Sequence, residues 1–121
     1  MMLADFGAEV VSISRPGPRE NFDPSQFFSR GKQSIVVDIR RPDGAQLIRH
    51  MTTQADVFLE GFRPGVMERR GLGPNDLMAI SSRLVYARLT GYGQNGPLSQ
   101  SAGHDINYLA SAGLLGTLGD E

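Results

Sequence analysis

Four short runs of apolar residues constrain the possible fold more than any other feature of the chain. Their positions are residues 9–14, 34–39, 56–60 and 84–89. Their β-branched and aromatic side chains are typical of strands. Residues 42–54 start with Pro42 and Asp43 and place apolar side chains at helical spacing, which predicts a helix. Strands that alternate with helices form right-handed βαβ units, so the predicted fold class is α/β with a parallel sheet and flanking helices.

Further helices are predicted at residues 66–70, 74–81 and 105–118, the first of them closed by Gly71. A single turn of helix is predicted at residues 27–28. Residues 1–7 read as the end of a helix with Gly7 as its C-cap, and they lack the basic and small-residue features of a signal peptide. A chain that starts inside a helix is expected to be part of a longer protein.

Composition narrows the functional classes. The 121 residues form one domain at most, and the net charge of −1 argues against a general nucleic-acid binder. The chain has no cysteine and only two histidines, His50 and His104, so no metal site is expected. No apolar run approaches the roughly 18 residues that a membrane span needs.

A glycine motif follows the fourth strand. Gly91, Gly93 and Gly96 match the spacing of a dinucleotide-binding fingerprint, but that fingerprint must open a helix. Residues 97–103 do not place apolar side chains at helical spacing. We therefore interpret the glycines as residues that let a loop turn tightly. Residues 30–34 resemble the end of a phosphate-binding loop but lack its first glycine, and this interpretation is rejected.

Arginines recur at or just after predicted strand ends, at Arg15, Arg40, Arg63 and Arg69. Ligands of parallel sheets bind beyond these ends, and arginine is the preferred partner of phosphate. The pattern favours an anionic, phosphate-bearing ligand as much as it favours a solvated basic face.

His104 is the one histidine in a plausible site. It lies between Gly103 and Asp105, at the start of the last predicted helix, where the helix dipole favours the neutral imidazole that a general base needs. Spacing alone leaves two alternatives open, a general base and a structural histidine, and it favours the second. His50 is interpreted as structural.

An ordered set of motifs covers nearly the whole chain. They are ADFGAEVV at residues 4–11, Arg15-Pro16, RGKQS at 30–34, EGFRPGV at 60–66, LGP at 72–74, LVYARLTGYGQ at 84–94 and GHDINY at 103–108. This set resembles the α-methylacyl-CoA racemases of the family III CoA-transferase superfamily. The histidine of the GHDINY motif favours the racemases, because the transferases typically have another residue there.

The resemblance implies a Rossmann-like parallel sheet with flanking helices. Residues 1–121 would be a partial CoA-binding large domain, with the family's first strand before residue 1 and the remainder after residue 121. Full-length members form interlocked homodimers. The default compartment is cytoplasmic, with peroxisomal or mitochondrial alternatives in a eukaryote. No cofactor is expected, because CoA is part of the acyl-CoA thioester substrate.

The resemblance also assigns roles to residues. His104 would be catalytic. The residues that would contact CoA and the thioester are Arg15, Val37, Asp38, Ile39, Arg40, Gly61, Phe62, Arg63, Arg69, Gly103, Asp105, Ile106, Asn107 and Tyr108. Asp105 is expected to act through its backbone and as a helix cap.

The implied reaction interconverts R and S 2-methylacyl-CoA thioesters through an enolate. The family's partner for His104 is an aspartate beyond residue 121, so these residues alone are expected to be inactive. Two alternatives stay open: a CoA transferase of the same superfamily, and a nucleotide-binding α/β module without acid/base chemistry.

Overall fold

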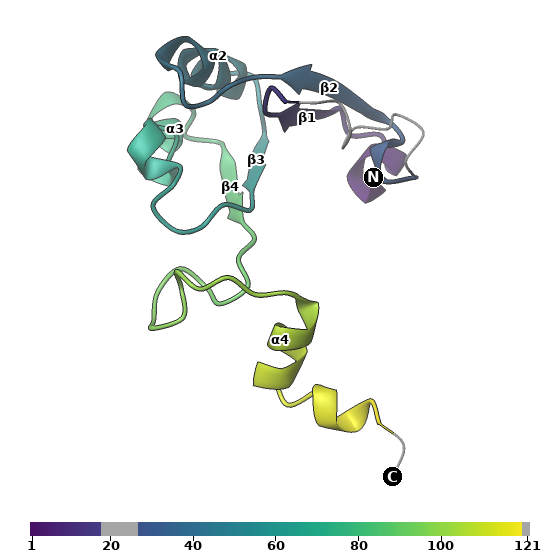
Figure 1. Ribbon diagram of the computed structural model, residues 1–121. Coiled ribbons are helices and arrows are strands. Elements are labelled where there is room, and N and C mark those ends of the chain that lie inside the picture. The colour runs from purple at the N-terminus through teal and green to yellow at the C-terminus, as the bar shows by residue number, and fades with distance from the viewer. Residues whose placement is uncertain (18–26, 120–121) are drawn as a thin grey trace. The chain divides into compact units, whose positions relative to one another are not determined.

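The computed structural model describes residues 1–17 and 27–119, and the chain divides into two compact units, Met1–Ile48 and Arg49–Glu121. Each unit contains one pair of parallel strands, so the described strands form two separate two-stranded sheets (Figure 1). The α/β class and the parallel pairing are therefore confirmed. Within the described ranges, no helix is both long and apolar enough to cross a membrane.

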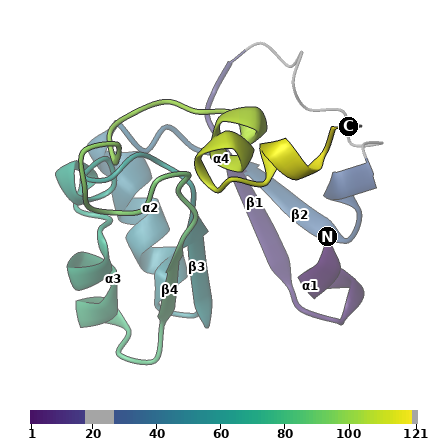
Figure 2. The ribbon, with the colours of Figure 1, turned by 90° about the horizontal axis from the view of Figure 1, so that it is seen from below.

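The first unit is built around β1 (Val10–Ser14) and β2 (Lys32–Val36), which run parallel from Val10 opposite Lys32 to Ser14 opposite Val36 (Figure 2). A short helix, α1 (Met2–Asp5), precedes them, and Gly7 follows it with φ +94°. The expected helix end near Gly7 is thus confirmed. The single helical turn expected at residues 27–28 is the 3-10 helix η2 (Phe27–Ser29).

The second strand ends earlier than the sequence predicts. The ladder continues only through the Val37 N–H, which donates to the Ser14 carbonyl at 2.8 Å. The next side chain then turns the backbone, because Asp38 Oδ1 accepts from the Arg40 N–H at 3.0 Å. Residues 37–40 therefore form the turn between β2 and helix α2 (Pro42–Thr52), and they do not form a strand end. The predicted start of α2 at Pro42 is confirmed.

The second unit pairs β3 (Val57–Glu60) with β4 (Val85–Arg88) in parallel, as predicted to within a residue or so at each end. Between them, the helix predicted at residues 66–70 is only the 3-10 helix η3 (Glu68–Arg70), which Gly71 closes with φ +64°. Helix α3 (Pro74–Ile80) follows. The buried apolar side chains of this unit include Met67, Leu72, Leu77 and Leu84.

The predicted helix over residues 105–118 is wrong in its extent. Helix α4 covers only Asp105–Ser111, and a separate 3-10 helix, η4, covers Leu115–Thr117. Gly113 lies between them with φ +76°, a left-handed conformation that ends a right-handed helix.

Leu77 belongs to the buried core of the second unit. Its side chain is 0% exposed, whereas that of Met78, the next residue of α3, is 45% exposed. Leu77→Ala should lower the free energy of unfolding by about 2–5 kcal/mol, because the substitution leaves a cavity. Met78→Ala should change it by less than about 1 kcal/mol. Urea unfolding of both variants measures the difference, and equal losses would contradict the described core.

Tyr86 makes the free energy of unfolding depend on pH in the alkaline range. Its hydroxyl donates to the Leu72 carbonyl at 2.9 Å. Burial, and next the negative charge of Glu60, raise the pKa of Tyr86 from 10.0 to about 12. The unfolded chain loses this phenol proton first. The contribution of Tyr86 to stability is therefore fully present below about pH 10 and is lost as the pH rises towards about 12.

Tyr86→Phe should consequently show a smaller fall in unfolding free energy between about pH 9 and about pH 11 than the unsubstituted protein shows. Denaturant unfolding at the two pH values measures this fall. An identical fall in both proteins would mean that Tyr86 does not titrate late.

Candidate active site

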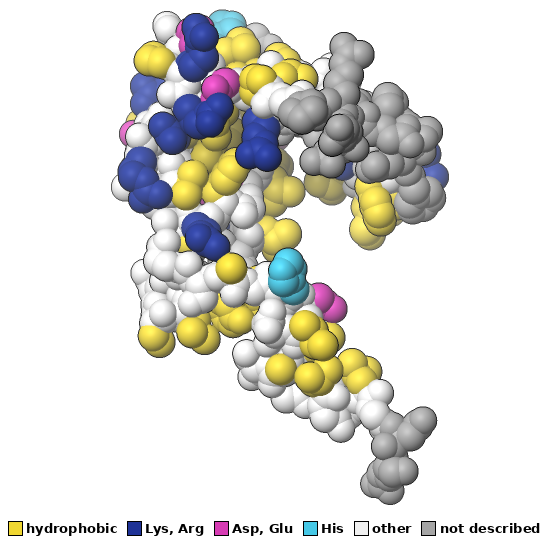
Figure 3. All heavy atoms as spheres, viewed as in Figure 1, with side chains coloured by type: hydrophobic (Ala, Val, Ile, Leu, Met, Phe, Trp, Pro, Cys, Tyr) yellow, Lys and Arg dark blue, Asp and Glu magenta, His cyan; other side chains and the backbone are white. Residues whose placement is uncertain are grey.

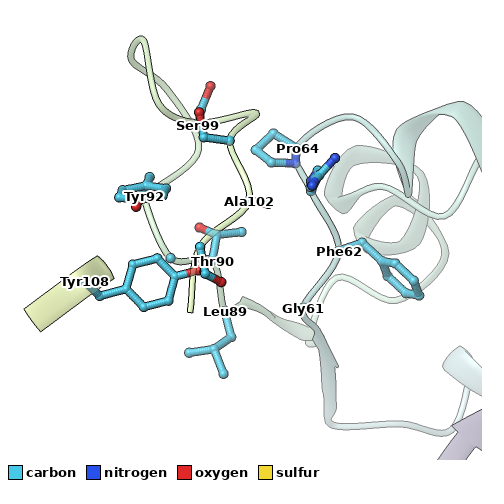
Figure 4. Close-up of a pocket in the computed structure, with 13 residues that line it drawn as sticks. Gly61, Phe62, Pro64, Leu89, Thr90, Tyr92, Ser99, Ala102 and Tyr108 are labelled. Atoms are coloured by element: carbon cyan, nitrogen blue, oxygen red, sulfur yellow. The ribbon is translucent and has the colours of Figure 1, made fainter. Parts of the chain in front are cut away.

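A cavity of about 610 Å³ lies in the second unit, beyond the carboxyl ends of β3 and β4 (Figure 4). One wall is the loop 61–64 after β3, and the other includes residues 89–92 after β4. Residues 99 and 101–103 and the Tyr108 ring complete the lining. Ligands of parallel α/β sheets bind at this edge, so the cavity is the candidate substrate site.

Tyr108 explains two of the glycines around the cavity. Its hydroxyl donates to the Gly103 carbonyl at 2.8 Å, and its ring meets the Tyr92 ring edge-on at 5.0 Å between centroids. A Cβ at Gly91 would lie only 2.2 Å from the Tyr108 ring, and one at Gly103 would lie 2.7 Å away. Only glycine leaves room for this ring at both positions.

The glycine motif is therefore loop geometry, as the sequence analysis predicts. Gly93 and Gly96 have φ values of +78° and +101°, and the next helix starts only at Asp105. No helix opens after Gly96 to receive a pyrophosphate, so the dinucleotide-binding interpretation is excluded.

His104 is exposed and occupies the N-cap position of α4. Its N–H donates to Asn107 Oδ1 at 2.9 Å, and its carbonyl accepts from the N–H groups of Asn107 and Tyr108. Backbone bonds therefore fix the position of the histidine and leave its imidazole facing outward. The expectation that Asp105 caps the helix is wrong, because the capping side chain is that of Asn107 and Asp105 is the first helical residue.

The predicted contact residues fall into three groups. Gly61, Phe62, Arg63, Gly103 and Tyr108 line the cavity. Asp105, Ile106 and Asn107 lie in the first turn of α4, are exposed, and are not among the lining residues. Arg15 and residues 37–40 belong to the other unit.

Two arginines of the second unit flank one loop. Arg63 is exposed and lines the cavity, and the Arg69 guanidinium lies over Gly65, where an added Cβ would be 2.9 Å from Nη1. Basic side chains gather over the part of this unit that holds α3 and the β3–β4 pair (Figure 3). This arrangement suits an anionic ligand.

Arg40, in the first unit, already has an anionic partner. Its Nε and Nη2 donate to the two carboxylate oxygens of Asp38 at 2.8 and 2.9 Å. These bonds, together with the one from the Arg40 N–H, lower the pKa of Asp38 to about 2. A phosphate group at Arg40 would have to share the guanidinium with Asp38. Arg15 is exposed just beyond the end of β1.

A charged network that the sequence does not predict lies beside the cavity. Glu60 and Arg88 end the two parallel strands opposite each other, with Arg88 Nε 3.6 Å from Glu60 Oε1. Arg88 also pairs with Glu68 of η3. The sequence shows an acid at the end of one predicted strand and an arginine one residue before the end of the next, but it does not show that these strands are neighbours. In the described part of the chain, no group of three or more His, Cys, Asp or Glu side chains could hold a metal ion.

Known proteins of similar sequence show to which family the chain belongs. The family model described as CoA-transferase family III matches residues 1–121. The chain belongs to CoA-transferase family III. Human alpha-methylacyl-CoA racemase is 51% identical over 119 residues, which are 98% of this chain and 30% of the racemase. Human succinyl-CoA:glutarate CoA-transferase is 38% identical over 133 residues, covering 100% of this chain and 30% of that protein.

Solved structures agree with the fold. The crystal structure of Rv3272 from Mycobacterium tuberculosis superimposes with a TM-score of 0.84 at 42% identity, covering 98% of this chain and 35% of that one. The chain therefore represents part of the family III fold, and it spans about 30% of the length of the curated relatives named above. Racemases and transferases both occur among the relatives, so membership of CoA-transferase family III does not by itself fix the reaction.

Tyr108 and Gly91 give a prediction for the site. Gly91→Ala should lower the free energy of unfolding by about 1–3 kcal/mol, because the new methyl group overlaps the Tyr108 ring. In a Tyr108→Ala background, the same substitution should cost at least about 1 kcal/mol less, since the overlap is gone. Denaturant unfolding of the two single variants and the double variant measures this coupling.

Gly61→Ala is the matched control. A Cβ at Gly61 would meet only the Leu89 carbonyl oxygen, at an ordinary 3.5 Å, so this substitution should show no coupling to Tyr108. Strictly additive effects of Gly91→Ala and Tyr108→Ala would contradict the contact.

Proposed function

We propose that this chain contributes the CoA-binding part and one proton-transfer group of a racemase that interconverts R and S 2-methylacyl-CoA thioesters. The observation that carries the proposal is the placement of His104. It directly follows Gly103 of the cavity lining and has its imidazole exposed. The higher identity to the racemase than to the glutarate transferase, 51% against 38%, supports the same choice.

In the proposed reaction, His104 accepts the proton from the carbon next to the thioester carbonyl and becomes imidazolium. The electron pair of the broken C–H bond moves into the carbonyl, giving an enolate. A second group returns a proton to the opposite face and so inverts the centre. When the substrate has the other configuration, His104 donates the proton. The second group is proposed to be an aspartate outside these 121 residues.

The enolate oxygen needs a hydrogen-bond donor. The backbone N–H of Asp105 is proposed for this role, because the first N–H groups of a helix have no acceptor within the helix. The acid side chain of Asp105 itself has no place in the proton transfer.

Recognition of CoA is proposed to rest on the arginines. Arg63 borders the cavity and Arg69 lies over the neighbouring Gly65. Arg15 and Arg40 are included because the family resemblance assigns CoA contacts to them. Arginine forms paired hydrogen bonds with phosphate oxygens, and CoA carries several phosphate groups. CoA enters as part of the substrate, so the proposal includes no separate cofactor. The active form is proposed to be a homodimer.

A CoA transferase is the second candidate. The observation that favours it is the group of transferases among the relatives, which includes a probable fatty acyl-CoA transferase of Mycobacterium tuberculosis at 40% identity over 126 residues. A transferase would move CoA to a carboxylate acceptor and would not require His104 for proton exchange.

Replacement of His104 tests the choice. In the full-length protein, His104→Ala should lower the rate of α-proton exchange in deuterated water by about 10²–10⁴-fold for the 2-methylacyl-CoA enantiomer whose proton His104 accepts, the usual contribution of a placed base. His50→Ala is the matched control and should leave the rate unchanged, since His50 lies in the last turn of α2. Mass spectrometry of the recovered thioester measures the exchange.

Two results would count against the racemase. One is exchange of both enantiomers that persists at the unsubstituted rate in His104→Ala. The other is acyl transfer to an added carboxylate that survives the substitution while no exchange occurs in either protein, which would establish the transferase.

A further inference from the structure

The charged network at the ends of β3 and β4 has no part in the proposed proton transfer, yet it reaches both walls of the cavity. Glu60 is 8% exposed, although it carries a carboxylate. Its Oε2 accepts from the Phe62 N–H at 2.6 Å. Phe62 lies in the loop 61–64, which forms one wall. Glu60 therefore holds the start of that loop directly.

Arg88 connects to the other wall. Its Nη1 donates to Gln94 Oε1 at 2.6 Å. The Gln94 amide group lies 3.4 Å from the hydroxyl of Thr90, a residue that lines the cavity. Glu60 and Arg88 are partners in the ladder. The Arg88 guanidinium is therefore linked to both loops, through Glu60 to Phe62 and directly to Gln94.

The geometry of the pair is suited to placement more than to stability. The Arg88 Nε is buried and, among the residues that the structure describes, has no hydrogen-bond acceptor; Glu60 Oε1 is 3.6 Å away. An ion pair of this kind, with one partner buried and the other 20% exposed, often stabilises a fold no more than apolar side chains of the same volume would. The two partners also bond to the loops that leave their strands, Glu60 to the Phe62 N–H and Arg88 to Gln94.

We propose that Arg88 is a positioning residue, which sets the separation of the loops 61–64 and 89–96 for binding of the CoA thioester through Glu60 on one side and Gln94 on the other. This inference rests on the proposed function for the identity of the ligand. It concerns binding, whereas His104 concerns the chemical step.

Hydrogen–deuterium exchange of two variants of the full-length protein, Gln94→Leu and Arg88→Met, tests the proposal. Gln94→Leu should raise amide exchange in residues 89–96 about tenfold or more, because a hydrogen bond to a charged group is lost. Arg88→Met should raise it in residues 61–64 as well. Gln94→Glu keeps an acceptor oxygen for Arg88 and should restore exchange close to that of the unsubstituted protein.

The matched control is Arg83→Met. Arg83 precedes β4, and its side chain is 87% exposed and pairs with Asp56 at 3.5 Å, so its loss should leave both loops unchanged. If Arg88 were merely structural, exchange would rise across the whole second unit, β3 and β4 included. That uniform rise, or no rise at all, would overturn the proposal.

Calorimetric titration with CoA supplies the functional measurement. Gln94→Leu should raise the dissociation constant of CoA about tenfold, while Gln94→Glu should stay close to the unsubstituted protein. Unchanged affinity in Gln94→Leu would overturn the positioning role. A protein that binds CoA but does not exchange the α-proton would defeat the proposed reaction and leave this inference standing.

Discussion

The parallel ladder between β3 and β4 is the constraint on which the candidate site depends. Its register sets Glu60 opposite Arg88, so both strands end at the same level and both following loops leave from one edge. The loops contain little regular structure, and side-chain bonds hold them. Arg88 holds Gln94, Glu60 holds the Phe62 N–H, and Tyr108 closes over the glycines on the far wall. The backbone defines the edge, and a few buried polar contacts then shape the cavity.

Much of the fold is predictable from local sequence, because local forces decide it. Proline at the first helical position marks the start of α2 and α3, and β-branched runs mark the strands. Two of the errors also have local causes. The Asp38 side chain turns the chain before the predicted end of β2, and Gly113 divides the last predicted helix. The spacing of apolar residues, from which the elements are predicted, does not reveal a side-chain turn or a glycine with positive φ.

The candidate site is predictable only in part. Strand ends and arginines point correctly to the loop 61–64, since the rule for parallel sheets is general. The Glu60–Arg88 pair is missed because one sequence does not reveal which strands are neighbours or in what register. The Asn107 cap is missed because local sequence favours the acidic Asp105 as the cap, whereas the helix starts one residue earlier than that role requires. Local sequence patterns therefore predict which loops form the site. Only the pairing of β3 with β4 shows which side chains stabilise those loops.

The central claim is that His104, fixed by its backbone beside the cavity and exposed at its imidazole, transfers the α-proton of a CoA thioester. The most direct measurement uses the full-length protein with a single enantiomer of a 2-methylacyl-CoA in deuterated water. Chiral analysis and mass spectrometry of the recovered thioester then follow configuration and deuterium together. The account predicts that the inverted enantiomer appears and carries deuterium at the α-carbon. Inversion without deuterium, or full retention of configuration with CoA moved to a carboxylate acceptor, would contradict it.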